Sequence, residues 1–361
     1  YRRVELFEKP VFVHRAQAMC YAYIFALQNN METIGIQMTY CNLETEQTKY
    51  FREEFSFEEI KKWFDDLMEE YGKWATFQCE MKNQRQASIK ELNFPFEYRP
   101  GQKKLVSDVY RTIMRQKLLF MQAPTGVGKT ISTIFPAVKA VGEKLADRIF
   151  YLTAKTITAT VAKETFALLE KNGYRAKTIQ ITAKEKLCPC DEMECNPLTC
   201  PYAKGHFDRV NDAVFDLLHR CDMIERDDIL SQADRYTVCP FELCLDTASW
   251  CDNIICDYNY VFDPNVYLKR FFQEGIKGDY IFLIDEAHNM VERSRQMYSA
   301  QIYKEDFLTV KRIMKEHSHS IEKALEKCNK ILLGMKRECE NYTVYDTFGN
   351  MVFSFMRLMT L

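Results

Sequence analysis

A glycine-containing loop in the first half of the chain combines the residue types that bind a nucleoside triphosphate. Gly126 and Gly128 allow backbone amides to turn toward a β-phosphate, and a following helix would add the favourable dipole of its N-terminus. Lys129 can reach the β- and γ-phosphates, while the Thr130 hydroxyl can ligate Mg²⁺. The loop therefore predicts a nucleotide site formed by Ala123, Pro124, Thr125, Gly126, Val127, Gly128, Lys129 and Thr130.

The segments on both sides of this loop supply the expected context. The apolar run at residues 118–121 predicts a buried strand, and a helical pattern opens at Ile131. Strand, glycine loop and helix in this order is the arrangement in which such a loop binds phosphates.

A second nucleotide signal lies near residue 285. The run YIFLI at residues 280–284 is rich in β-formers and uncharged, which is typical of a strand inside a parallel sheet covered on both faces. Asp285 and Glu286 follow at its C-terminal end, where open α/β sheets bind ligands. There Asp285 would hold Mg²⁺ through water, and Glu286 would polarise the attacking water. His288 lies one helical turn beyond and is placed to sense the γ-phosphate.

The cysteines form a third candidate site. Nine of the 14 cysteines fall between Cys188 and Cys256, and Cys-Pro pairs recur at Cys188, Cys200 and Cys239. A proline directly after a ligand cysteine fixes a turn, and this arrangement is common in iron–sulfur loops. A nucleotide-binding context indicates a reducing compartment and disfavours disulfides. Four thiolates suit zinc equally well, so the spacing alone does not separate an iron–sulfur site from a zinc site.

Composition limits the class of protein. A chain of 361 residues suggests two or three domains, and its 47% hydrophobic residues can build cores. We find no apolar run of membrane-helix length and no signal-peptide pattern, so we expect a cytoplasmic protein, in a bacterium, without membrane contact. The net charge of −2 confines any nucleic-acid binding to a local groove. The chain starts without Met and ends in an apolar run, so we expect a fragment of a longer protein.

Phosphate loop, cysteine-rich insertion and the motif Asp-Glu-Ala-His at residues 285–288, in that order, resemble the XPD/DinG family of superfamily 2 DNA helicases. The resemblance covers roughly residues 95–300, and superfamily 2 proteins commonly carry an alanine where Ala123 stands. It implies a RecA-like α/β motor lobe that uses ATP and Mg²⁺ to translocate on single-stranded DNA. It further implies separation of forked DNA with 5′→3′ polarity in a DNA-repair setting.

The same resemblance implies a [4Fe–4S] cluster in the insertion. The ligands that it implies are Cys188, Cys195, Cys200 and Cys239, with Cys190 as the alternative to Cys195. The other cysteines of the segment are expected to pack as apolar residues; these are Cys221, Cys244, Cys251 and Cys256.

Further contacts follow from the resemblance. Thr153, Lys155 and Thr156 come after an expected strand at residues 148–152 and match the family's DNA-backbone motif. Asp257-Tyr-Asn-Tyr260 matches the family's segment after the cluster domain. Gln102 lies where superfamily 2 proteins hold the adenine edge, a task that suits a carboxamide with a donor and an acceptor. The alternative is that Gln102 is an exposed residue of a first helical turn.

The first 80 residues have a different pattern. Gln17 and Tyr21, four residues apart on a predicted helix, share a face. A strand at residues 34–40 and a hairpin partner at 50–55 follow, and a capping box at residues 56–59 opens a second helix. This order resembles the C-terminal part of a RecB-like PD-(D/E)XK nuclease domain, although a purely structural helix remains the alternative.

That family's metal-binding Asp and Glu-x-Lys pair would precede Gln17, and no matching pair does. We therefore expect no DNA cutting by this chain alone.

The predicted fold class is α/β, a parallel-sheet P-loop motor lobe with a cysteine-rich insertion. The tail is rich in Lys and Glu at helical spacing, and the resemblance implies a helical arch domain there. The predicted domains are the nuclease-like segment at 1–80, the motor lobe at 81–183 and 247–300, the cluster insertion at 184–246, and the start of the arch at 301–361.

Two other functions stay open. One is a DNA-binding redox switch whose ATPase only gates conformation, and the other is a zinc-stabilised scaffold in a repair or defence complex. We expect a monomer. The residues after His288 are too few for an arch and a second motor lobe, so we expect weak nucleotide binding and poor turnover.

Overall fold

The computed structural model describes residues 8–124, 126–154 and 156–361, and the side chains of residues 156–157 also lie outside the described part. The chain forms two compact units, each described here by itself. The larger unit takes in the chain up to Val261 together with Tyr267–Ala287, and the smaller unit consists of Phe262–Val266 and His288–Leu361.

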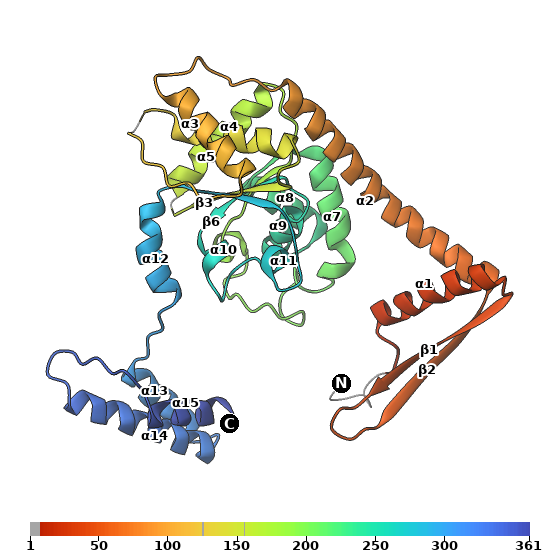
Figure 1. The fold of residues 1–361 in the computed structure, drawn as a ribbon. Helices are drawn as coiled ribbons and strands as arrows, with labels where there is room; N and C mark the ends of the chain where they lie inside the picture. Colours follow the sequence, from red (N-terminus) through yellow and green to blue (C-terminus); the bar gives the residue numbers. More distant parts are fainter. Residues whose placement is uncertain (1–7, 125, 155) are drawn as a thin grey trace. The chain divides into compact units, whose positions relative to one another are not determined.

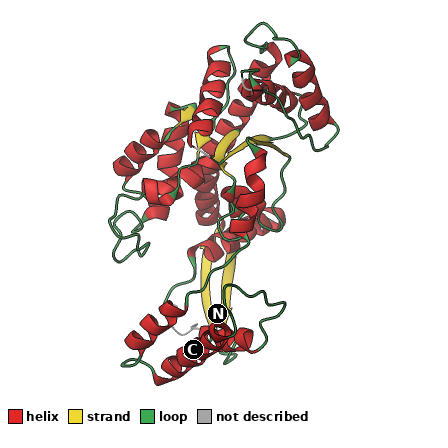
Figure 2. Cartoon of the chain, turned by 90° about the vertical axis from the view of Figure 1, so that its left-hand side faces the viewer, coloured by secondary structure: helices red, strands yellow, loops and turns green. Residues whose placement is uncertain are grey.

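The larger unit is built on a parallel β-sheet. Its strand order is β5-β4-β6-β3-β7, and every neighbouring pair is parallel. Helices α3, α4 and α5 cover one side and α8 to α11 lie on the other, so that helices surround the strands (Figures 1 and 2). The strands are β3 (Arg148–Thr153), β4 (Thr178–Gln180), β5 (Met223–Ile224), β6 (Asn253–Asp257) and β7 (Tyr280–Ile284). The predicted α/β class with a parallel sheet is therefore confirmed.

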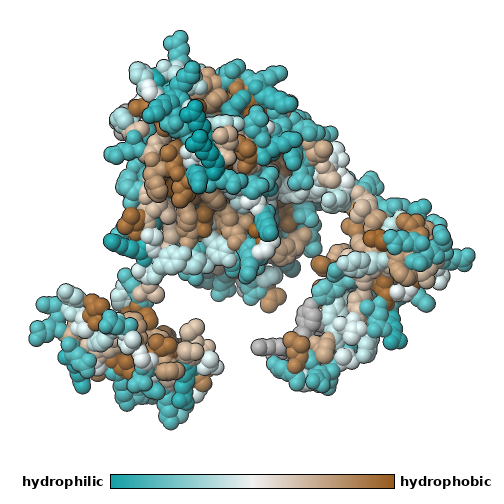
Figure 3. Space-filling model, in the orientation of Figure 1, coloured by the Kyte–Doolittle hydropathy of each residue, from teal (hydrophilic) through white to brown (hydrophobic). Residues whose placement is uncertain are grey.

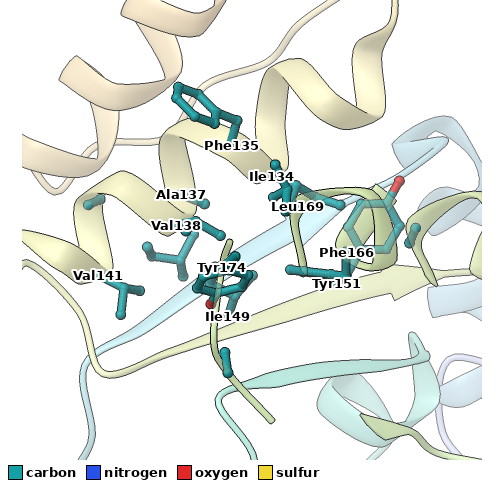
Figure 4. Close-up of a cluster of buried hydrophobic side chains, with 14 of the residues drawn as sticks. Ile134, Phe135, Ala137, Val138, Val141, Ile149, Tyr151, Phe166, Leu169 and Tyr174 are labelled. Carbon is teal, nitrogen blue, oxygen red and sulfur yellow. The ribbon is translucent and has the colours of Figure 1, made fainter. Parts of the chain in front are cut away.

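The main core lies between this sheet and the three helices α3 (Gln102–Met114), α4 (Lys129–Gly142) and α5 (Thr156–Lys171). Ile134 and Val138 of α4 are fully buried. They lie close to Ile149 of β3, with Phe166 and Leu169 of α5 beside them (Figure 4). Burial of these apolar side chains fixes α4 against the strands. The start of α4, where the phosphate loop ends, is thereby held at a defined place.

One strand prediction is wrong. Residues 117–124 contain no regular secondary structure, and Leu118 and Phe120 are each 88% exposed. Among the described strands β7 is an edge strand and not an interior one, and its Phe282 and Ile284 are exposed. An apolar run becomes a strand only when a neighbouring edge accepts its backbone hydrogen bonds, and the run at 118–121 pairs with no described strand. Hydrophobic side chains consequently reach the surface of this unit (Figure 3).

The N-terminal segment folds as a helix, an antiparallel hairpin and a second helix, as predicted. These elements are α1 (Phe12–Asn29), β1 (Thr33–Cys41), β2 (Thr48–Ser56) and α2 (Phe57–Glu91). The capping box forms, because Ser56 accepts from the Glu59 amide while the Glu59 carboxylate accepts from the Ser56 amide. Helix α2 is 35 residues long and runs without a break across the predicted boundary at 80/81. Its last turn enters the main core through Ile89.

The cysteine-rich segment lies between β4 and β6 and is mostly helical. It contains α6 (Lys184–Leu187), α7 (His206–Arg220), α8 (Arg226–Tyr236) and α9 (Pro240–Ala248), with the edge strand β5 between α7 and α8. Two short helices, α10 (Asn259–Phe262) and α11 (Lys269–Phe272), precede β7. The loop from Cys188 to Gly205 carries four of the cysteines and has no helix or strand.

The smaller unit is helical, as the tail pattern predicts. A short 3-10 helix (Ala287–Asn289) leads into α12 (Met290–Met297), α13 (Lys304–Met314), α14 (His319–Arg337) and α15 (Asn350–Met359). Its core is small and centres on Phe307, Leu325 and Cys328. Within the described ranges of the chain, no helix is long and apolar enough to cross a membrane.

Candidate functional site

The phosphate loop has the backbone conformation that its glycines predict. Gly126 and Gly128 have φ angles of 86° and 76°, in the left-handed region that favours glycine. Gly128 is the N-cap of α4, so Lys129 and Thr130 are the first residues of that helix. Arg99 donates a hydrogen bond to the Gly126 carbonyl. The predicted loop-to-helix junction is therefore present, with Thr125 outside the described residues.

The side chain of Gln102 forms hydrogen bonds that stabilise this loop. Its side chain is buried, and its Nε2 donates to the Val127 carbonyl and to Ser132 Oγ, both at 3.1 Å. Its Oε1 accepts from the Arg99 amide at 3.1 Å. A Cβ on Gly128 would come within 2.9 Å of Nε2, so this close approach requires glycine. The exposed position considered for Gln102 is wrong, and its contact with adenine remains a prediction.

Tyr151 joins the two nucleotide motifs, although it was not predicted as a site residue. Its hydroxyl lies near the side chain of Thr130 on α4 and near the carboxylate of Asp285 after β7, and it interacts electrostatically with both. Burial raises the pKa of Tyr151 well above its usual range, and the charge of Asp285 adds to the shift. The one available signal was a hydroxyl near the C-terminal end of the apolar strand at residues 148–153.

The turn after β7 carries the predicted carboxylates. Burial, and then the nearby Glu286, raise the pKa of Asp285, while Tyr151 and Lys129 act in the opposite direction. The Tyr258 hydroxyl donates to the Asp285 carbonyl and to the Glu286 carbonyl, the latter at 3.3 Å. Glu286 has a φ of 50°, a conformation that non-glycine residues rarely adopt and that often marks functional turns. Its side chain is exposed, so it can reach a bound ligand.

Thr130, Tyr151 and Asp285 thus lie near one another at the C-terminal ends of the strands, with Lys129 close enough to act on the Asp285 carboxylate. A basic group, a hydroxyl and a carboxylate at this edge can hold a phosphate and a divalent cation together. His288 is exposed and lies in the smaller unit, and its γ-phosphate role remains a prediction.

The predicted DNA-backbone motif is described only in part. Thr153 is buried, and its hydroxyl hydrogen-bonds with that of Thr158. Lys155 and the side chain of Thr156 lie outside the described residues. The DNA role of the three residues therefore stays a prediction.

The cysteines that the resemblance implied as ligands lie near one another. Burial raises the pKa of Cys190 to about 11, and the adjacent thiols of Cys200 and Cys188 add to the shift. The nearby Cys195 thiol raises the pKa of the Lys184 ammonium, and Cys239 and Cys188 add to the shift. All 14 cysteines are free thiols. The donor types therefore suit a metal site, and the predicted ligand Cys195 and its alternative Cys190 both lie in the group.

The thiols do not form a finished metal site. Within the described parts of the chain, no three His, Cys, Asp or Glu side chains are arranged to hold a metal ion. Cys244, Cys251 and Cys256 are buried and Cys221 is half-buried, which agrees with their expected packing role.

The nuclease-like motif lies on an exposed face of α1. Gln17 and Tyr21 are both exposed there, and the neighbouring Arg15 forms an ion pair with Glu53 of β2 at 2.7 Å. The contact fixes α1 on the hairpin, and the nuclease-like role of Gln17 and Tyr21 remains a prediction.

Comparisons with known proteins find helicases. The DEAD_2 family model matches residues 164–307, which include the cysteine-rich segment and the Asp285 turn. The chain is 20% identical to the regulator of telomere elongation helicase 1 of Rattus norvegicus over 248 residues, which are 55% of this chain and 19% of that protein. It is 28% identical to a Fanconi anemia group J protein homolog of Gallus gallus over 76 residues, 21% of this chain and 6% of that one. The chain thus spans about a fifth or less of these relatives.

Solved structures with some likeness to this chain include two of XPD. A truncated XPD has a TM-score of 0.45 and 15% identity, covering 72% of this chain and 76% of that one. An XPD helicase has a TM-score of 0.43 and 15% identity, covering 73% of this chain and 51% of that one.

Proposed function

We propose that this chain is the ATP-binding motor lobe of an XPD-like DNA helicase. The observation that supports the proposal most is the position of the Tyr151 hydroxyl, which lies near both Thr130 and Asp285. It joins the residue types that bind phosphate to those that bind Mg²⁺, and sequence motifs alone do not create such a link. The helicase relatives supply the reaction class.

In this proposal each residue has a defined task on ATP. Lys129 neutralises charge on the β- and γ-phosphates, and Thr130 offers its hydroxyl oxygen to Mg²⁺. Tyr151 lies near both residues and would orient the Thr130 hydroxyl and the Asp285 carboxylate toward the ion. Asp285 holds the ion through water, and the exposed Glu286 accepts a proton from the attacking water.

The proposed polynucleotide is single-stranded or forked DNA. Thr153, Lys155 and Thr156 would contact its backbone, with movement in the 5′→3′ direction. The N-terminal segment with Gln17 and Tyr21 would be the end of a nuclease-like domain, and the smaller unit would begin a helical arch.

A [4Fe–4S] cluster would be held by Cys188, Cys195, Cys200 and Cys239. Neighbouring thiols are the donor type that such a cluster needs. In the described part of the chain, they are not arranged to hold a metal ion. When bound, the cluster would crosslink the loop that has no helix or strand to the start of α9. Thiolates, not thiols, would be the ligands of such a cluster.

The test uses protein purified without oxygen, with forked DNA carrying either a 5′ or a 3′ single-stranded tail. ATP-dependent strand separation of the 5′-tailed substrate, lost in Lys129→Ala, supports the motor and its polarity. Nucleotide-dependent DNA binding without strand separation by any longer form of the protein favours a redox-sensing switch. Stoichiometric zinc without iron favours the scaffold.

A further inference from the structure

A polar cavity of about 390 Å³ lies in the larger unit, away from the nucleotide residues. One wall is α2, which contributes Gln78, Lys82 and Arg85. The facing walls come from the beginnings of the parallel strands β3, β6 and β7, whereas Lys129 and Asp285 lie at the opposite, C-terminal edge. The volume is that of a small-ligand pocket.

The walls of this cavity carry an excess of positive charge. Five lining side chains are basic, and two, Asp147 and Asp252, are acidic. Arg148 and Arg270 are already engaged, the first by the Ser249 carbonyl and the second by carboxylates of α9. In the described structure, Lys82 and Lys277 have neither an ion pair nor a hydrogen bond, and both are exposed.

Arg85 adds a second, independent observation. Its side chain is 7% exposed, and its Nη1 donates to Asp252 and to the Asp147 carbonyl. Its Nε is buried and has no acceptor among the described residues. A buried donor of a charged group without a partner is costly and calls for an unseen partner. Asp252 pairs with Arg85, and within the described chain neither Lys82 nor Lys277 forms an ion pair with Asp147, the remaining acidic residue of the lining.

We infer that this cavity binds a phosphate-bearing small anion between α2 and the strand beginnings. A phosphoryl group offers several strong acceptors, which suits Lys82 and Arg85 on α2 with Lys277 on the facing wall. A bound anion would hold α2 more firmly against the sheet. Helix α2 already packs here through Trp74, whose ring centroid lies 4.4 Å from that of Trp250 and 5.0 Å from that of Phe215. The inference does not depend on the nucleotide site.

The test measures binding of inorganic phosphate and of pyrophosphate by calorimetry and by thermal stabilisation. All variants carry Lys129→Ala, so that the phosphate loop does not contribute. Lys82→Gln with Lys277→Gln should weaken binding about tenfold or more, the effect of losing charge-assisted hydrogen bonds. Lys61→Gln with Lys62→Gln, an equal charge change on α2 outside the cavity, should leave it unchanged.

A second pair of variants tests the cavity while keeping both lysines. Gln78→Glu puts a negative charge on the cavity wall and should weaken phosphate binding, whereas Gln84→Glu, on α2 outside the lining, should not. A single-stranded oligonucleotide identifies the source of the phosphate. Affinity for it that falls with the lysine pair assigns the site to a DNA backbone, and unchanged affinity assigns it to a free anion. No phosphate binding in the Lys129→Ala protein, or equal loss in the matched controls, would overturn the inference.

Discussion

Strong sequence motifs mark both the predicted nucleotide site and the cysteine-rich segment, but the two differ in how the fold holds their residues. Gly128, Lys129 and Thr130 occupy the end of a loop and the first turn of α4, and Asp285 directly follows β7. Four of the cysteines lie on the loop before α7, and the fifth is the N-cap of α9. A site made from the ends of core elements forms before its ligand arrives.

The two regions differ in the interaction that offsets the conformational entropy lost when each segment becomes ordered. Burial of Ile134 and Val138 against β3 fixes the phosphate loop's helix. The loop at 188–205 has almost no buried apolar side chain to fix it. Metal binding supplies folding free energy to such thiol sites, because a finished site rarely exists without the ion. The comparison therefore predicts ligand-independent order at one site and ligand-dependent order at the other.

The largest expected effect is on ATP hydrolysis. Glu286→Gln should retain ATP binding and lower turnover by about 10²–10⁴-fold, because an amide does not accept the proton of the attacking water. Steady-state phosphate release, with nucleotide affinity measured in parallel, checks both parts. Lys129→Ala serves as the control that loses turnover through the phosphate contact. Turnover within about threefold of the unaltered protein would contradict the role of Glu286, given that expected range.

The second effect is on bound iron. Protein purified without oxygen should carry about four iron and four sulfide per chain. Serine at Cys188, Cys195, Cys200 or Cys239 should remove most of the iron, because serine is a poorer ligand for it. Cys221→Ser is the matched control and should keep it. Iron that survives Cys195→Ser but not Cys190→Ser would move the ligand assignment to Cys190.

Much of the fold could be predicted because its elements follow local rules. The capping box at Ser56 and the alternating pattern of residues 34–40 were sufficient for α2 and β1. The run at 118–121 shows where local rules stop. Its hydrophobicity equals that of a strand, but Leu118 and Phe120 are exposed because strand formation depends on a partner edge distant in sequence.

The site was predictable where function requires a special residue type. Glycines with positive φ, a lysine and a carboxylate are visible in sequence, so the two nucleotide motifs were found. Tyr151 was missed because a tyrosine in an apolar strand is usually core, and only the sheet brings it to Thr130 and Asp285. The buried position of Gln102 also depends on tertiary contact, through Val127 and Ser132.

A smaller effect is expected from the link between the motifs. Tyr151→Phe removes the hydroxyl that lies near Thr130 and Asp285, and should weaken Mg²⁺-dependent ATP binding by up to about tenfold, the range expected for one lost polar contact. Tyr174→Phe is the matched control, since Tyr174 is buried in the same core and its hydroxyl bonds Asn253 instead. Equal loss of affinity in both variants would show a general packing effect rather than a task of Tyr151.

The smallest expected effect tests the separation of the two sites most sharply. Removing the cluster ligand Cys200 by serine should change ATP affinity by less than about twofold, well under the tenfold of a lost hydrogen bond. The reason is that α4 and β7 are held by the main core, to which Cys200 does not belong. The same variant should increase hydrogen exchange of backbone amides at residues 188–205, because the loop would lose its crosslink. A large fall in ATP affinity would mean that the cysteine segment supports the nucleotide site across the sheet, and the two sites would then have to be treated as one cooperative unit.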